Sequence, residues 1–247
     1  MTRTTESIRW RGGQVTRIEA LTDAVFGFAI TLLVVSLEVP ETFDELTGMM
    51  RGFIAFAGSF TLLILVWSYH YRLFSRYDLE DTYTIVLNSV LLFVVLFYVY
   101  PLKFVAFILL GGGMRGAFTS PQQVPLVMAI YSAGFVAVFL VFAALYRHAY
   151  ALRDRLALSP VEAHGARAKF AECLVMVGVG TVSVLCAVLL PARAAAPVAG
   201  FIYFLIGPLQ WYVGVRMNRL APAPAAAPAL AGSPVEPAEP MPPIHTS

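Results

Sequence analysis

Long apolar blocks alternate along this chain with short polar stretches, and each apolar block covers about 20 residues. A helix rises about 1.5 Å per residue, so a block of this length crosses the roughly 30 Å hydrocarbon core of a bilayer. The pattern therefore predicts an all-α membrane protein with six transmembrane helices. The predicted spans cover approximately residues 17–39, 52–74, 82–110, 125–147, 170–191 and 197–219.

Two of the predicted spans contain a proline: Pro101 near the end of the third and Pro208 within the sixth. Proline removes one backbone hydrogen bond from a helix, but neighbouring helices in a membrane bundle can satisfy the carbonyl that is left. We therefore expect both helices to kink at the proline rather than to end there.

Composition supports this fold class, because 59% of the residues are hydrophobic and only 13% are charged, against about 25% charged in soluble domains. We expect three regions: a cytoplasmic N-terminus over residues 1–16, a six-helix transmembrane domain over 17–219, and a cytoplasmic tail over 220–247. The tail is rich in Ala and Pro, which predicts disorder. The formal net charge of +2 gives no support for a nucleic-acid partner.

The positive charges predict the orientation in the membrane. Of the 17 Lys and Arg residues, thirteen precede the first span or follow the second, fourth and sixth spans, and four lie on the other side. Lys and Arg are enriched in cytoplasmic loops, so both termini are expected in the cytoplasm. We expect a multi-pass protein of the cell membrane with membrane lipids as partners.

Polar side chains recur at the cytoplasmic ends of the first three predicted spans. They are Arg17, Thr22, Asp23, Trp67, His70 and Asn88. A charged side chain within a span costs about 3 kcal/mol unless it is partnered, whereas a carboxylate, imidazole, amide and indole can satisfy one another. The residues alone leave three interpretations open: a structural network, a network that biases a gate, and a proton relay through Asp23 and His70.

One stripe of the first span is a candidate pore lining. Phe28, Thr31, Leu32 and Val35 fall within an arc of about 100° when successive residues are placed about 100° apart. Nearly every face of this helix is apolar, so the periodicity favours packing against lipid or the protein core. A pore lining remains the alternative.

Motifs of several other classes are missing from the sequence. It contains no Thr-Val-Gly-Tyr-Gly segment, so a conventional carbonyl-lined potassium filter is excluded. No nucleophile–base pair and no metal-ligand spacing occurs within the spans. We therefore predict no enzyme, no catalytic residue, no metal site and no cofactor.

Three pieces of the chain carry a family resemblance. They are Arg17-Ile-Glu-Ala-Leu21-Thr22-Asp23 before the Thr31 helix, Trp67-x-x-His70-x-x-x-Phe74, and Leu87-Asn88-Ser-Val-Leu-Leu-Phe with Tyr100-Pro101 downstream. The first resembles the Arg-x-x-x-Phe-Ser-Asp hallmark of the transmembrane protein 175 family, the lysosomal and prokaryotic potassium channels. This chain has Leu21-Thr22 in place of Phe-Ser, and Phe28 where the family more often has Ile or Leu.

The resemblance implies a prokaryotic plasma-membrane homotetramer in which the first helix of each subunit lines a central pore. It implies a passive, potassium-favouring cation channel closed by a hydrophobic constriction, with the potassium ion as permeant species and other monovalent cations as partners. Phe28, Thr31, Leu32 and Val35 would then form the constriction. Two alternatives stay open: a proton-conducting or proton-coupled transporter that uses Asp23 and His70, and a non-conducting membrane assembly protein.

Overall fold

The computed structural model describes residues 16–35, 42–106, 108, 118–120 and 122–222. The predicted N-terminal segment over residues 1–16 and the predicted tail over residues 220–247 lie almost entirely outside the described residues. The sequence predictions about those two segments therefore remain predictions.

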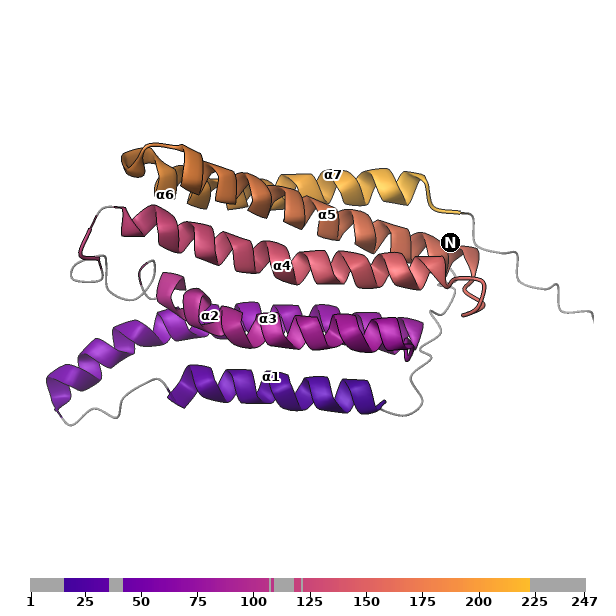
Figure 1. Cartoon of the computed structure of the whole chain (residues 1–247), viewed down its shortest axis with the longest axis horizontal. Helices are drawn as coiled ribbons and strands as arrows, with labels where there is room; N and C mark the ends of the chain where they lie inside the picture. The colour runs from indigo at the N-terminus through magenta and orange to yellow at the C-terminus, as the bar shows by residue number, and fades with distance from the viewer. Residues whose placement is uncertain (1–15, 36–41, 107, 109–117, 121, 223–247) are drawn as a thin grey trace, which may run out of the picture.

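Six helical segments run along the long axis of the molecule, in the order of the six predicted spans (Figure 1). Their elements are α1 (Arg17–Val35), α2 (Phe43–Tyr77), α3 (Thr82–Ala106), α4 (Gln123–Ala151), α5 (Pro160–Leu189), α6 (Ala192–Phe201), η2 (Ile202–Leu205) and α7 (Ile206–Arg219). Among the described residues, four segments are long and apolar enough to cross a membrane. They are α3, α4, α5 and the run Ala192–Arg219.

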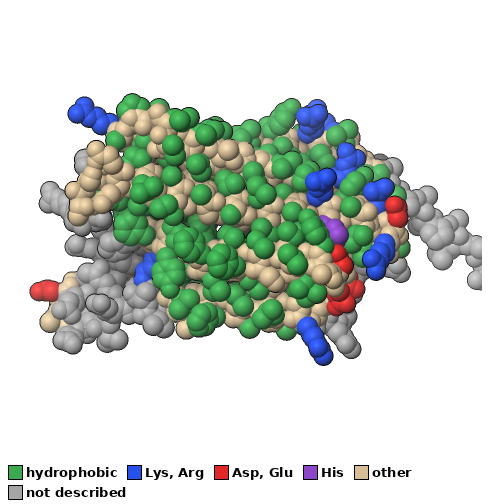
Figure 2. Space-filling view, in the orientation of Figure 1, with side chains coloured by type: hydrophobic (Ala, Val, Ile, Leu, Met, Phe, Trp, Pro, Cys, Tyr) green, Lys and Arg blue, Asp and Glu red, His purple; other side chains and the backbone are tan. Residues whose placement is uncertain are grey.

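The segments alternate in direction, which gives the bundle two distinct ends. The Arg17 end holds the starts of α1, α3 and α5 and the ends of α2, α4 and α7, whereas the Val35 end holds the ends of α1, α3 and α5 and the starts of α2, α4 and α6. On the face drawn in Figure 2, Lys and Arg side chains gather mainly toward the Arg17 end, and hydrophobic side chains cover the middle.

Helix α1 lies at one edge of the bundle (Figure 1). Among the described elements it contacts only α2 and α3, whereas α4 packs against α3 and, most extensively, α5. The core lies where α2, α3, α4 and α5 meet, and its fully buried residues include Leu91, Phe142 and Leu145. One side of α1 therefore has no neighbour within the described part of the chain.

Helix α5 begins at Pro160, ten residues before the predicted span, because the local sequence forms a capping box. The Ser159 side chain accepts a hydrogen bond from the Glu162 backbone N–H, and the Glu162 carboxylate accepts one from the Ser159 N–H. Pro160 occupies the first helical turn, where its missing N–H is not needed. The helix thus extends beyond the apolar block that the hydropathy pattern identifies.

The two prolines have different outcomes. Helix α3 does not end at Pro101 and continues to Ala106. In the sixth segment, four residues of 3₁₀-helix (η2) separate α6 from α7, and Pro208 lies in the first turn of α7. Since Pro208 has no N–H to donate to the preceding turn, a tighter helical turn before it is compatible with the backbone hydrogen bonds that remain. The expected single sixth helix is therefore divided into two.

Close packing of α3 against α4 depends on Gly134. A Cβ atom added there would lie 2.3 Å from Cδ2 of Tyr98, whereas one added at Gly178 would meet no atom within 4 Å. Overpacking of this kind costs about 1–3 kcal/mol. We expect Gly134→Ala to lower the thermal unfolding temperature in detergent relative to Gly178→Ala, which shares the gain in helix propensity. Equal unfolding temperatures for the two variants would contradict this packing.

Candidate functional site

The N-terminus of α1 is fixed by a second capping box. The Glu19 N–H donates to Oγ1 of Thr16 over 3.2 Å, and the Thr16 N–H donates to Oε2 of Glu19 over 2.9 Å. This pair satisfies two backbone donors and starts the helix directly before Arg17. The start of α1 therefore sets the register of its two faces.

Helix α1 has one buried face and one exposed face. The inward face is buried against α2 and α3 and consists of Thr22, Phe26, Ala29 and Leu33. The outward face is exposed and consists of Leu21, Ala24, Phe28 and Thr31. The two sets alternate at helical spacing, so the protomer buries one side of α1 and leaves the other side uncovered.

Two of the four predicted constriction residues lie on the outward face. Phe28 is 57% exposed and Thr31 is exposed, whereas Leu32 is partly buried at the edge of that face. The Thr31 hydroxyl donates to the Gly27 carbonyl over 2.9 Å, so its hydrogen is satisfied within the helix while its oxygen can still accept. Val35 is the last residue of α1, and its side chain lies outside the described part of the structure.

Polar groups of the first three helices meet on the inward face in what we call the Asn88 cluster: Thr22, His70 and Asn88. The Asn88 amide Nδ2 donates to Thr22 Oγ1 over 2.9 Å, and the Thr22 hydroxyl donates to the Ile18 carbonyl over 2.8 Å. His70 Nε2 lies 3.0 Å from Asn88 Oδ1. An amide oxygen only accepts, so Nε2 is the protonated nitrogen of this imidazole.

The Asn88 cluster is sealed from its surroundings. Thr22, His70 and Asn88 are at most 2% exposed. The His70 ring stacks on Phe74 at 4.2 Å between centroids and lies 6.4 Å from Phe26. A fully buried chain of hydrogen bonds through α1, α2 and α3 fixes the rotation of α1, because any turn of the helix leaves a donor or acceptor unpaired.

Asp23 pairs with Trp67, whereas a direct proton relay requires it to contact His70. The Trp67 indole N–H donates to Asp23 Oδ1 over 2.7 Å at the exposed side of α1. Within the described residues, Asp23 and His70 share no hydrogen bond, since His70 pairs with Asn88. Arg17 is exposed at the first residue of α1, and within the part of the chain that the structure describes it forms no hydrogen bond or ion pair with the other five polar residues. The structure therefore joins five of the six polar residues through two separate sets of contacts.

A chain of hydroxyl groups links the later helices of the bundle, and the sequence pattern did not indicate it. The Ser183 hydroxyl donates to the Ala199 carbonyl over 2.9 Å, and its oxygen lies 2.8 Å from the Ser132 hydroxyl oxygen. The Tyr203 hydroxyl donates to the Ser132 hydroxyl oxygen over 3.0 Å. This chain connects α4 and α5 to α6 and η2, where the sixth segment is divided. Its sequence signal was a serine within each of two long apolar blocks.

A contact between a histidine and a carboxylate at the Arg17 end joins the start of α3 to the end of α4. His148 Nε2 lies 2.8 Å from Asp81 Oδ2, and the Thr84 hydroxyl donates to Asp81 Oδ1 over 2.5 Å. Burial acts to raise the pKa of the Asp81 carboxyl, but the hydrogen bonds from Thr84 and His148 outweigh it, so its pKa lies below the usual value.

This depressed pKa predicts a pH-dependent contribution to stability. A carboxyl with a lower pKa in the folded state stabilises the protein above its unfolded pKa, and the contribution is lost as pH falls through the folded pKa. We expect Asp81→Asn to lower stability near neutral pH by about 1 kcal/mol, and the difference to disappear as pH falls through the lowered pKa of the folded-state carboxyl. Asp78→Asn is the matched control, since Asp78 is exposed with φ of 49°, a conformation that Asn also tolerates. A pH-independent difference between Asp81→Asn and the parent would contradict a stabilising role for the ionised Asp81 carboxylate.

These features define the class: a multi-pass, all-α membrane protein whose first helix is buried on one side, where Thr22 joins a buried chain of hydrogen bonds, and uncovered on the other side, where Phe28 is exposed. Residues 17–98 match the family model described as the endosomal/lysosomal potassium channel TMEM175. The chain is 40% identical over 218 residues to a potassium channel of Marivirga tractuosa, an alignment that covers 83% of this chain and 88% of that one. It is 31% identical over 156 residues to the potassium channel Cha6605_3372 of Chamaesiphon minutus, covering 60% and 71% of the two chains.

Solved structures agree with the sequence comparisons. A crystal structure of a variant of the potassium channel MtTMEM175, in complex with a nanobody–MBP fusion protein, superposes with a TM-score of 0.76 at 37% identity, covering 87% of this chain and 98% of that one. A lysosomal potassium-selective channel TMEM175 homologue from Chamaesiphon minutus gives a TM-score of 0.55 at 25% identity, covering 82% and 97%. This chain belongs to the TMEM175 potassium channel family, which is a family of channels and not of enzymes.

Proposed function

We propose that four copies of this chain form a potassium-favouring cation channel in the prokaryotic plasma membrane, with the outward face of α1 lining a central pore. The observation that carries this proposal is the uncovered apolar side of α1, where Phe28 is 57% exposed although the opposite side of the same helix is fully buried. The relatives that match over most of the chain are named potassium channels. A central pore requires a symmetric assembly, and the uncovered face of α1 is free to meet its copies around such an axis.

The proposed pore closes by excluding water from an apolar constriction formed by Phe28, Leu32 and Val35 of each subunit. Such a constriction conducts only when its apolar layers move apart and allow water to enter. The Thr31 hydroxyl oxygen supplies an acceptor beside this layer, where a partly dehydrated cation gains a ligand. Potassium, which loses its hydration shell more readily than smaller monovalent cations, is the favoured permeant ion.

The polar residues on α1 to α3 hold the pore helix in place in this proposal. The Asn88 cluster fixes the rotation of α1 from the inward side, and the Trp67–Asp23 hydrogen bond fixes it from the exposed side. Arg17 then lies at the cytoplasmic mouth of the pore. Opening is a movement of α1 relative to α2 and α3, its neighbours among the described elements.

Purified protein in liposomes tests the proposal. With a potassium gradient across the vesicle membrane, we expect potassium flux that stops when the membrane is held at the potassium reversal potential, and weaker flux when sodium replaces potassium. Ion accumulation that requires a pH gradient would instead support the proton-coupled transporter. Absence of flux from tetrameric protein would support the non-conducting assembly protein.

A further inference from the structure

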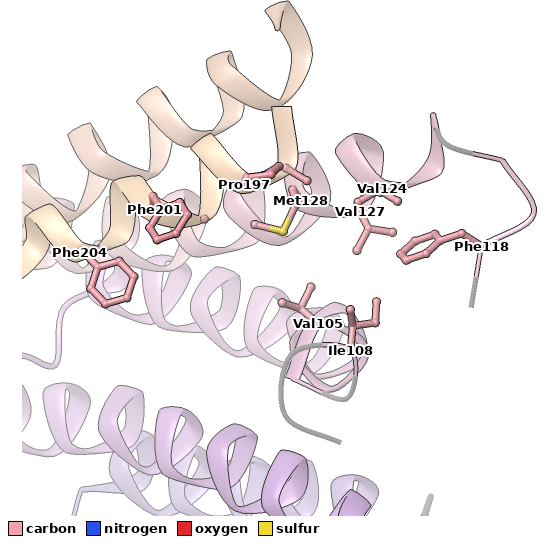
Figure 3. Close-up of a pocket in the computed structure, with 11 residues that line it drawn as sticks. Val105, Ile108, Phe118, Val124, Val127, Met128, Pro197, Phe201 and Phe204 are labelled. Atoms are coloured by element: carbon pink, nitrogen blue, oxygen red, sulfur yellow. The ribbon is translucent and has the colours of Figure 1, made fainter. Parts of the chain in front are cut away.

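An apolar cavity of about 440 Å³ lies at the Val35 end of the bundle, away from α1. It is formed where the end of α3, the start of α4 and the α6–η2 junction meet, and Figure 3 shows side chains from these elements facing a common space. Val105, Val127, Met128, Pro197 and Phe201 are among the residues that line it. Its volume is in the range of sites that bind small molecules, roughly 300–1,000 Å³.

Water is a poor occupant of this cavity, because every residue that lines it is apolar. An ordered water needs two to four polar partners, and an empty space of this size forfeits dispersion contacts. The cavity is open to the outside of the bundle, where Phe201 is 70% and Phe204 77% exposed. Both phenylalanines belong to a segment that is apolar enough to span a membrane, so lipid hydrocarbon is the medium expected at the opening.

A positive charge lies on the same side of α6 as the cavity. Arg193 is exposed and precedes Pro197 by four residues and Gly200 by seven, which places all three along one face of the helix. Both Pro197 and Gly200 line the cavity. Helical side chains lean toward the N-terminus, so the guanidinium extends from the cavity toward the membrane surface.

We propose that this cavity binds one acyl chain of a phospholipid from the leaflet at the Val35 end, with the lipid phosphate beside Arg193. Chain and headgroup then contact one continuous strip of α6, from the charge at its first turn to the aromatic side chains at its end. The proposal rests on the membrane placement of the proposed channel but not on ion conduction.

Gly200 offers a way to fill the cavity without disturbing the backbone. A Cβ atom added there would lie 3.9 Å from Cε of Met128, an ordinary contact, so the remainder of a leucine side chain can occupy the cavity. Gly207→Leu is the matched control, because an added Cβ there meets no atom within 4 Å and Gly207 is exposed on α7. Val127→Phe fills the same cavity from α4 if Gly200→Leu fails to assemble.

The experiment uses the full chain in vesicles of phosphatidylglycerol and phosphatidylcholine, with a trace of either lipid that carries a photoactivatable group on one acyl chain. After illumination, mass spectrometry should locate the label on peptides containing Val105, Val127 or Phe201. We expect loss of this label in Gly200→Leu and retention in Gly207→Leu. In Arg193→Gln, phosphatidylglycerol should lose its excess of labelling over phosphatidylcholine.

Three outcomes would overturn the proposal. Labelling of the lining peptides that persists in both filled variants places the lipid elsewhere. Unlabelled lining peptides in the parent protein mean that another occupant, such as residues 109–117 or a second copy of the chain, fills the cavity. An unchanged lipid preference in Arg193→Gln removes the headgroup contact. Potassium flux recorded on the same vesicles keeps a failure of the lipid site separate from a failure of the channel.

Discussion

Phe28→Asn is expected to turn the protein into a leak, with potassium efflux from liposomes at least about tenfold faster than in the parent. A tenfold faster efflux requires the free-energy barrier to ion passage to fall by about 1.4 kcal/mol. Burial of an apolar side chain of this size contributes more than that, so its loss from the constriction is large enough to produce the effect. The amide would hydrate the constriction in every subunit, and a hydrated constriction conducts. Leu32→Asn should act in the same direction.

Phe93→Asn is the control for this experiment. Phe93 is an equally bulky side chain, 73% exposed on α3, and it lies outside the outward face of α1. Asparagine there adds a polar group to the surface without changing the proposed constriction, so potassium efflux should stay at the parental rate. Parental efflux in both the Phe28 and Leu32 variants would remove these residues from the gate.

Asn88→Ala is expected to produce the largest loss of stability among substitutions in the polar residues. It leaves the His70 N–H without its acceptor and removes the amide that donates to Thr22, and both sites are buried. A buried donor left unsatisfied costs about 1–3 kcal/mol, although hydrogen bonds between membrane helices average nearer 0.6 kcal/mol. The two lost bonds together should lower the unfolding temperature in detergent by several degrees.

Ser89→Ala provides the comparison, because Ser89 is the exposed neighbour on α3 and its hydroxyl donates only to the Ile85 carbonyl of its own helix. This variant should unfold close to the parental temperature. If the account is right, Asn88→Ala also changes the potassium flux of the protein that remains folded, since α1 would lose its rotational constraint. An Asn88→Ala protein with parental stability and parental flux would leave the Asn88 cluster without a role.

Apolar block length predicted the number and order of helical segments, because crossing hydrocarbon demands a fixed length of helix. It did not predict where the helices end. Helix α5 begins at Pro160 and not near residue 170, since the Ser159 capping box operates on polar residues outside the apolar block. The division of the sixth segment at η2 depends on Pro208 together with hydroxyl contacts from α4 and α5, which are tertiary.

Within the candidate site, the sequence predicted at which level of the bundle the polar side chains lie, but not which of them form hydrogen bonds with each other. Asp23, His70 and Asn88 were among the side chains expected at one level of the bundle, but the hydrogen bonds there join His70 and Asn88 to Thr22, and Asp23 pairs with Trp67 instead. The partner of each side chain depends on how far α1 is rotated, and a helix that is apolar on nearly every face carries no such signal. For the same reason the sequence could not predict which side of α1 is uncovered: Phe26 and Phe28 are the same residue type and differ only in what packs against them.

Helix α1 thus combines two tasks on opposite sides. Its inward side carries the buried hydrogen bonds that fix its rotation, and its outward side carries the apolar surface that the proposed pore requires. A small rotation of α1 changes both at once. In the proposed channel, polar residues at the Arg17 end would therefore influence the constriction farther along the same helix.

Accessibility of position 31 to water decides whether the outward face of α1 lines a pore. Thr31→Cys protein in liposomes is treated with a charged, membrane-impermeant thiol reagent while potassium flux is recorded. Leu185→Cys serves as the control, because Leu185 is 50% exposed on α5 and α5 does not contact α1 among the described elements. If α1 lines the pore, the reagent blocks flux through Thr31→Cys and leaves flux through Leu185→Cys and the parent unchanged. Flux that continues unchanged after the Thr31→Cys thiol has reacted, or a thiol at this position that only lipid-soluble reagents reach, would contradict this role of α1.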